Sequence, residues 1–197
     1  MLATAQPIHK RSDVKNRICL CSASESRALL LSNFGVDFIQ KTADFDEEQI
    51  QTATAKDFVY LASKGKLEAA EKLYGIDMPL LCADTVIAGA DGTILRKAKN
   101  VDDARRILNI QSGSTISIIT SVHYKSRELL FTDTSATHYR FAPFEKADLE
   151  VYLESREWQD KAGGCMVEGF CKKYILEVNG YESTAMGLQV EVLKPWL

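Results

Sequence analysis

A short polar segment, Ser22-Ala23-Ser24-Glu25-Ser26-Arg27, follows an apolar run and precedes a leucine-rich stretch. The free N–H groups at the start of a helix, serine hydroxyls and a guanidinium group can together bind phosphate. The same segment also fits a capping box, in which Ser22 and Glu25 satisfy the first N–H groups of the helix. Both interpretations, an anion site and a helix cap, stay open from these residues alone.

A carboxylate, Asp84, lies in the sequence Ala83-Asp84-Thr85 near the end of a second apolar run. Such a side chain projects into the crevice where open α/β sheets bind ligands, and it can accept a proton from water. Aspartates near strand ends are also common turn formers. The loop 160–164 carries a cation between an aspartate and two glycines and fits a plain connection equally well. Taken singly, three further charged residues fit solvated surface: Glu47, Lys66 and Lys97.

The histidines, His9, His123 and His138, are scattered along the chain. None of them forms a spacing that would hold zinc. A catalytic metal in this protein is therefore expected to be a hard ion bound by carboxylates and phosphate oxygens.

Composition and charge exclude several classes of protein. The 24 lysine and arginine residues stand against 27 aspartate and glutamate residues, a net charge of -3. This balance gives no general attraction to nucleic acid or to an anionic membrane, so a bound phosphate must meet a local cluster of cations. Hydrophobic residues at 46% and charged residues at 26% are typical of a globular protein and exclude wholesale disorder. No apolar segment of the kind found in an export signal follows the basic residues near the N-terminus, and no apolar run approaches about 18 residues, so neither an export signal nor a membrane span is predicted.

Five cysteines, an odd number, occur without a C-x-x-C pair: Cys19, Cys21, Cys82, Cys165 and Cys171. Three of them lie in apolar runs. All five are interpreted as buried thiols of a protein in the reducing cytoplasm.

The elements that must position these residues alternate between strand and helix. Residues 1–16 are polar and aperiodic and are predicted to form a flexible leader before a single domain, 17–197. Apolar runs and turn residues predict strands at 18–21, 36–41, 80–88, 93–96, 115–124, 129–141 and 173–178. Periodic apolar faces and caps predict helices at 28–34, 58–74, 100–112, 145–154 and 188–193. This alternation, with hairpins interleaved, predicts an α/β protein with a mixed sheet.

In order and approximate spacing, the motifs resemble those of the Maf family of nucleoside triphosphate pyrophosphatases. The matching motifs are S-x-S-x-x-R after the first strand, an acidic pair, a lysine-bearing helix, A-D-T, a lysine after a hairpin, Y-L-E-S, K-A-G and a final G-L. The resemblance runs from about Ile18 to Leu193. It implies an elongated mixed sheet with flanking helices and a cleft between two lobes, as in the inosine triphosphate pyrophosphatases.

The resemblance also implies an activity and an assembly. A nucleotide would be hydrolysed between its α- and β-phosphates, giving a monophosphate and pyrophosphate, with Mg²⁺ or Mn²⁺ as the divalent metal. The protein would be a cytoplasmic homodimer that binds a nucleoside triphosphate and neither a membrane nor a nucleic-acid polymer.

Roles for individual residues follow from the same resemblance. Asp84 would accept the proton of the attacking water and, with Glu47, would bind the metal. The triphosphate would be held by Ser22, Ser24, Arg27, Lys66 and Lys97, and the base would be selected by Ser26, Thr85 and Glu168.

Some positions depart from the family pattern. Glu25 places a negative charge beside the anion site where the family has a proline, and Lys64 is an alternative to Lys66 on the lysine-bearing helix. Ser26 matches neither branch of the family. Thr85 resembles the branch that acts on thymidine and uridine triphosphates, and Glu168 resembles the branch that acts on 7-methylguanosine triphosphate. Because a glutamate accepts hydrogen bonds from the two donors of a guanine, a guanine-type or modified purine base is predicted.

Alternative interpretations remain for Glu168 and for the function of the protein. Glu168 also fits a solvated position or an ion pair with Lys161 or Lys172. A non-catalytic nucleotide-binding regulator of cell division is the alternative function, and the presence of both Asp84 and Glu47 favours the enzyme. An RNA-binding domain is disfavoured because no basic patch with interleaved aromatic residues is present.

Overall fold

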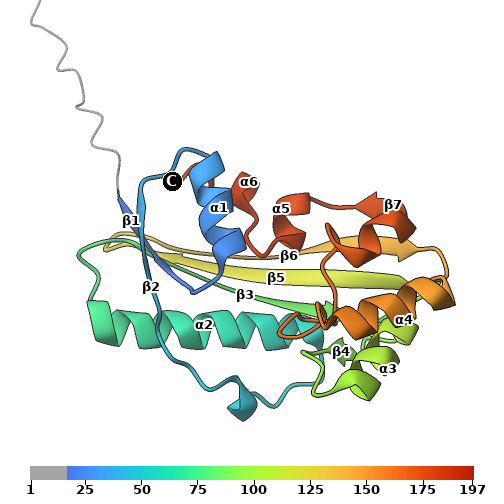
Figure 1. Ribbon diagram of the computed structural model, residues 1–197. Coiled ribbons are helices and arrows are strands. Elements are labelled where there is room, and N and C mark those ends of the chain that lie inside the picture. Colours follow the sequence, from blue (N-terminus) through green and yellow to red (C-terminus); the bar gives the residue numbers. More distant parts are fainter. Residues whose placement is uncertain (1–16) are drawn as a thin grey trace, which may run out of the picture.

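The computed structural model describes residues 17–197, so the predicted leader 1–16 lies outside the described residues. Its seven-stranded sheet has the order β2-β1-β3-β5-β6-β7, and β4 pairs with β3 (Figure 1). The strands are β1 (Ile18–Cys21), β2 (Phe38–Lys41), β3 (Leu80–Ala88), β4 (Ile94–Leu95), β5 (Thr115–Lys125), β6 (Leu130–Phe141) and β7 (Ile175–Asn179).

Six α-helices and two short 3₁₀ segments surround the sheet in the described part of the chain. Helix α2 lies along one face of the sheet, and α1, α5 and α6 lie on the other (Figure 1). Helices α3 and α4 lie together toward the end of the sheet that carries β4. The helices are α1 (Glu25–Asn33), α2 (Ala55–Tyr74), α3 (Val101–Gln111), α4 (Lys146–Ser155), α5 (Glu182–Ala185) and α6 (Val190–Leu193); the 3₁₀ segments are η1 (Glu47–Gln49) and η2 (Phe170–Tyr174).

The sheet is mixed, as predicted. Strand β1 runs parallel to both β2 and β3, whereas the neighbours from β3 through β7 pair antiparallel. Strand β1 pairs with β3 at Leu80 and Leu81, and β4 pairs with β3 from Ile87. Among the described residues, no strand pairs with this edge of β3 between those points. This gap in the pairing leaves the middle of β3, between Leu81 and Ile87, without a strand partner along this edge within residues 17–197.

Two packed clusters flank this gap and form the two predicted lobes. One joins α3, α4 and the adjacent ends of β5 and β6, with Leu108, Phe141 and Tyr152 among its buried residues. The other joins β1, α1 and α6, with Leu31 and Leu193 among its buried residues. The fold is therefore the mixed α/β architecture with flanking helices and an intervening cleft that the sequence predicts.

Most predicted elements are confirmed, and most of the differences lie at their ends. The strand predicted at 80–88 is β3 without change, whereas α1 begins at Glu25, three residues before the predicted start. Residues 170–174 form η2, so β7 begins only at Ile175. Helix α5 was not predicted, because four residues are too few for a helical period to show.

The interpretation of the cysteines is wrong for two of the five. Cys165 and Cys171 form a disulfide, because the loop between them folds back and brings the two side chains together. Cys19, Cys21 and Cys82 are buried and free, as predicted. Burial raises the pKa of Cys19 to about 12, so this side chain stays a neutral thiol.

None of the helices within residues 17–197 combines the length and the apolar character that crossing a membrane requires.

Candidate active site

Two carboxylates and an ammonium group meet on the α2 face of the sheet. The Nζ atom of Lys66 lies 2.5 Å from Oδ1 of Asp84 and 2.6 Å from Oε1 of Glu47. Lys66 lies four residues from both Ala62 and Ala70, on the face of α2 that packs on the sheet, so its side chain is directed toward the sheet. The structure thus brings together three residues from different elements that the resemblance assigned to catalysis, metal and phosphate.

Asp84 is 6% exposed, and its position shapes its acidity. Burial raises the pKa of the Asp84 carboxyl, the nearby Lys66 and Arg27 oppose that rise, and Glu47 adds to it. A carboxylate in such surroundings is a stronger base than one in water. Asp84 is therefore suited to accept a proton.

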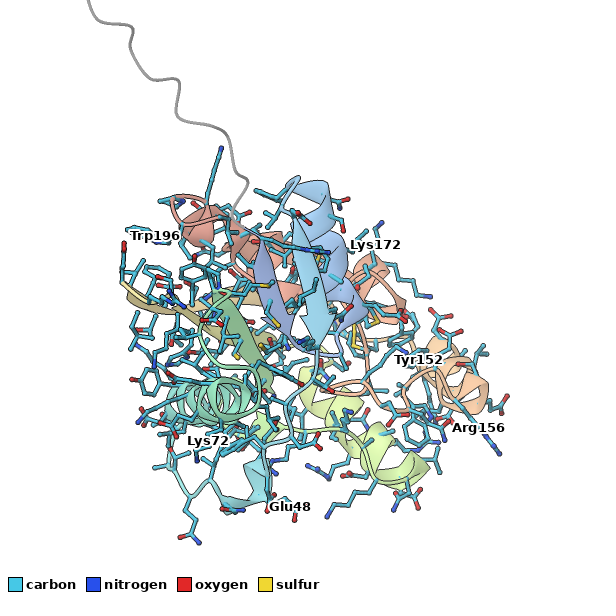
Figure 2. The ribbon with its side chains drawn as sticks, turned by 90° about the vertical axis from the view of Figure 1, so that its left-hand side faces the viewer. Glu48, Lys72, Tyr152, Arg156, Lys172 and Trp196 are labelled. Atoms are coloured by element: carbon cyan, nitrogen blue, oxygen red, sulfur yellow. A yellow bond between two sulfur atoms is a disulfide. The ribbon has the colours of Figure 1, made fainter. Side chains whose placement is uncertain are left out.

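Glu47 reaches this cluster because of a close approach between η1 and α2. A Cβ atom on Gly65 would overlap the ring of Phe45, so only glycine lets this ring lie against the helix. Figure 2 views α2 end-on and shows the segment that carries Glu48 beside it. The Asp46 side chain accepts a hydrogen bond from the N–H of Glu48 at 3.0 Å and caps η1. Gly65 and Phe45 are positioning residues that sequence reasoning missed.

Arg27 lies on the opposite face of the sheet, held at three of its nitrogen atoms. Its Nη1 donates to Oγ of Ser22 at 2.9 Å, its Nη2 to Oγ1 of Thr85 at 3.1 Å, and its Nε to the carbonyl of Gly187 at 2.8 Å. These bonds fix the plane of the guanidinium group and leave donors on both Nη atoms for a phosphate. Burial lowers the pKa of Arg27, whereas the charge of Asp84 raises it.

The capping box predicted for Ser22 and Glu25 is not formed, because Ser22 is not the N-cap of α1. Ser24 is the N-cap of α1, and its Oγ accepts from the N–H of Arg27 at 3.4 Å. Ser22 lies before the cap and faces Arg27. Ser22 is therefore available for an anion site next to the helix start.

A cavity of about 290 Å³ lies on the same side of the sheet as Arg27. All three residues that the resemblance assigns to base selection line it, together with Ser24 and Arg27. The other lining residues come from β3, β5, the loop 160–168 and the end of α5: Ile87, Ile118, Asp160, Lys161, Ala162, Cys165, Met166, Val167, Ala185, Met186 and Gly187. Its size and its mixture of apolar and polar walls suit a small ligand such as a nucleoside.

Two lysines differ from the cluster in their placement. Lys64 pairs with Glu68 at 3.6 Å on the exposed side of α2, so the structure favours Lys66 and not Lys64 as the lysine of the site. Lys97 is exposed and outside the cavity wall. Its backbone bridges Ala162, which places it against the loop that lines the cavity.

Glu168 lies in the cavity wall and is also exposed, so the structure agrees with both a cavity position and the solvated position of the alternative interpretation. Within residues 17–197, neither Lys161 nor Lys172 forms an ion pair with Glu168, so the predicted alternative of a surface ion pair is not observed. The disulfide between Cys165 and Cys171 closes the loop on which Glu168 lies.

The chemistry of the carboxylates fits a divalent metal ion. Mg²⁺ is commonly held by one or two carboxylates together with phosphate oxygens and water. Asp84 and Glu47 supply two such carboxylates, whose oxygens already converge on one cation, the Lys66 ammonium. No group of three or more metal-ligating side chains occurs in the described part of the chain. The residues present therefore fit a metal that binds together with a phosphorylated ligand.

The fold and the site together define an α/β protein in which carboxylates and cations meet at a strand edge that has no strand partner within residues 17–197. The Maf-like protein family matches residues 17–197, and the chain belongs to this family.

Curated relatives extend this assignment. The chain is 54% identical over 178 residues to the "Nucleoside triphosphate pyrophosphatase" of a Nitratiruptor species, covering 89% of this chain and 96% of the relative. It is 39% identical over 176 residues to a protein of the same name from Helicobacter pylori, covering 89% and 92%. It is 34% identical over 178 residues to the "dTTP/UTP pyrophosphatase" of Photobacterium profundum, covering 87% and 90%.

Proposed function

We propose that this member of the Maf family is a nucleoside triphosphate pyrophosphatase, a hydrolase that releases pyrophosphate from a nucleotide. The observation that carries the proposal is the meeting of Asp84, Glu47 and Lys66 at the edge of β3, with a nucleoside-sized cavity on the other face of the same strand. The names of the relatives at 54% and 39% identity support it.

Asp84 is the proposed general base. It accepts a proton from a water molecule, whose oxygen bonds to the α-phosphorus of the nucleotide. The bond from that phosphorus to the oxygen bridging to the β-phosphate breaks, and pyrophosphate leaves with the electron pair. General-base catalysis of this kind contributes about 10²- to 10⁴-fold to the rate.

Glu47 and Asp84 would hold a divalent metal, Mg²⁺ or Mn²⁺, together with the phosphates of the substrate. When bound, such an ion neutralises charge on the triphosphate and polarises the attacking water. Lys66 lies between the same two carboxylates and orients both of them through its ammonium group.

The cations and hydroxyls of the site would hold the triphosphate. Arg27 presents a fixed guanidinium plane, and Ser22 and Ser24 add hydroxyl groups at the start of α1. Lys66 and Lys97 approach from α2 and from the loop after β4. Together these groups would stabilise the charge that develops on the leaving pyrophosphate.

Ser26, Thr85 and Glu168 would select the base. Their position in the wall of one cavity supports this role. Glu168 favours a guanine-type base, and we expect Glu168→Gln to shift the ratio of kcat/KM toward dTTP and UTP relative to GTP and 7-methyl-GTP. An unchanged ratio would show that Glu168 does not contact the base.

The decisive experiment is a panel of ordinary and modified nucleoside triphosphates incubated with the protein and Mg²⁺ or Mn²⁺, with released pyrophosphate as the readout. Turnover that requires the metal supports the proposal. Tight nucleotide binding without pyrophosphate release, for every member of the panel, would instead indicate a non-catalytic nucleotide-binding regulator.

A homodimer and a cytoplasmic location belong to the same proposal, and the resemblance to the family supports them. Light scattering of the purified protein tests the first, and cell fractionation tests the second. Disulfides are rare in cytosolic proteins, and the structure has one between Cys165 and Cys171. Recovery of the protein outside the cytoplasmic fraction would therefore contradict the proposed location.

A further inference from the structure

A chain of hydroxyl groups runs behind the cavity, from Arg27 to helix α5. Oγ1 of Thr85 lies 2.8 Å from Oγ1 of Thr120, which in turn donates to the carbonyl oxygen of Thr184 at 2.7 Å. Thr85 and Thr120 are direct cross-strand partners in β3 and β5, so their side chains share one face of the sheet. Thr120 is 0% exposed, so its hydroxyl has no contact with bulk water.

The hydrogen bonds determine which hydroxyl donates and which accepts at each step of this series. A carbonyl oxygen only accepts, so the single proton of the Thr120 hydroxyl is used for Thr184. Thr120 must then accept the proton of Thr85. Thr85 also accepts from Nη2 of Arg27 at 3.1 Å. The hydroxyl of Thr85 therefore has no proton left for a ligand and offers the cavity only a lone pair.

A second acceptor lies in the same wall, since the carboxylate oxygens of Glu168 accept hydrogen bonds. Guanine, hypoxanthine, uracil and thymine carry a proton on a ring nitrogen of their pairing edge. Adenine and cytosine carry a lone pair there, which faces an acceptor unfavourably. The polarity of this wall thus separates the common bases into two classes.

We propose that Thr120 is a positioning residue for base selection: it keeps the Thr85 hydroxyl an obligate acceptor, so that the cavity prefers nucleotides whose base carries a ring N–H. This inference rests on the proposed pyrophosphatase activity and on the role of Thr85 in the cavity wall. Neither the sequence motifs nor the family resemblance pointed to Thr120, because it contacts the cavity only through Thr85.

The test compares Thr120→Val with Thr120→Ser. Valine has nearly the shape of threonine but cannot accept the proton of Thr85, so the Thr85 hydroxyl becomes free to donate to a ring nitrogen. We expect the ratio of kcat/KM for ATP and CTP to that for GTP and UTP to rise about 2- to 10-fold in Thr120→Val, the range of one ordinary hydrogen bond. Thr120→Ser keeps the hydroxyl and should keep the wild-type ratio. An equal loss of kcat/KM for all four substrates in Thr120→Val would overturn the inference, as would a Thr120→Ser variant that behaves like Thr120→Val.

A measurement on the unmodified protein keeps the inference testable if Thr120→Val does not fold. Methylation of the ring nitrogen removes the proton that Thr85 would accept, as in 1-methyl-GTP and 3-methyl-UTP. We expect each analogue to be hydrolysed at least about 10-fold less efficiently than its parent. Equal turnover of parent and analogue would overturn the inference while leaving the pyrophosphatase activity established. Absence of turnover for every nucleotide would instead refute the proposed function itself.

Discussion

Asp84 and Thr85 are consecutive in β3 and face opposite sides of the sheet. The carboxylate of Asp84 contacts Lys66 of α2, whereas the hydroxyl of Thr85 contacts Arg27 of α1. A ligand that reaches both must pass the edge of β3, and this edge is open between β1 and β4. In the proposed function this arrangement would place the base on one side of the sheet and the reacting phosphates at its edge, and it leads to specific expectations.

Replacing Asp84 should separate catalysis from binding. In Asp84→Asn the amide keeps the shape of the side chain and loses the base, so we expect kcat to fall about 10²- to 10⁴-fold. Nucleotide affinity, measured by calorimetry, should stay within a few-fold of the wild type. Asp77→Asn is the matched control, because Asp77 is exposed and its ion pair with Arg127 lies at the surface. Activity of Asp84→Asn close to that of the wild type would remove Asp84 from the catalytic role.

The two lysines of α2 should differ sharply in their effect on activity. Lys66→Ala removes the cation between Asp84 and Glu47, and we expect kcat/KM to fall about 10- to 100-fold, the worth of a hydrogen bond to a charged group. Lys64→Ala removes only an exposed pair with Glu68 and should leave kcat/KM nearly unchanged. The reverse result would mean that Lys64 is the lysine of the site.

Gly65→Ala should lower both stability and activity, although helices normally tolerate this substitution. Alanine has a higher helix propensity than glycine by about 1 kcal/mol, so Gly65→Ala would stabilise an isolated helix. Here the added methyl group overlaps the ring of Phe45, which must move and displace Glu47 with it. We expect a lower melting temperature and a lower kcat/KM. Adding Phe45→Ala to Gly65→Ala removes the overlap and should restore part of the lost activity; a double variant no better than Gly65→Ala would contradict this account.

His123 should make stability depend on pH. Burial lowers the pKa of His123 to about 4, with Lys64 adding to the effect, against an unfolded value of 6.5. Between these two values the unfolded chain binds a proton that the folded chain does not, so stability falls as the pH drops. From about pH 7 to about pH 5 the loss attributable to His123 is about 2 kcal/mol.

Urea unfolding of the wild type and His123→Gln at both pH values measures this contribution. The wild type should lose more stability than His123→Gln on acidification, whatever the stability of the variant at neutral pH. His138→Gln is the control, because His138 is exposed. Equal losses in the wild type and His123→Gln would show that His123 is not the responsible group.

Opening the disulfide should loosen the loop that carries Glu168. For so short a loop, the entropy of closure predicts a loss of about 2 to 3 kcal/mol when Cys165 and Cys171 are both replaced by alanine. We expect a lower melting temperature and a higher KM for the nucleotide, since residues 165–168 line the cavity. A dithiol reductant should reproduce both effects in the wild type and change nothing further in the double variant. A wild type insensitive to the reductant under denaturing and native conditions alike would argue against the bond.

The sequence by itself determined which elements form and which residues carry charge into the site. The signals that predict these elements are local: apolar runs such as 80–88, helix periodicity in 58–73 and glycines at the helix ends. Each depends on residues close together in the sequence, so it can be recognised without the tertiary structure. The motif spacing also indicated the residues that meet around β3, because each motif follows a strand or opens a helix.

Only the tertiary structure decided how these residues relate to one another. The choice of Lys66 over Lys64 depends on the rotation of α2 about its axis, and the disulfide between Cys165 and Cys171 depends on how one loop folds back. The contact of Gly65 with Phe45 and the relay from Thr85 through Thr120 to Thr184 join residues far apart in the chain. Such contacts arise from the packing of whole elements, and no local pattern in the sequence encodes them.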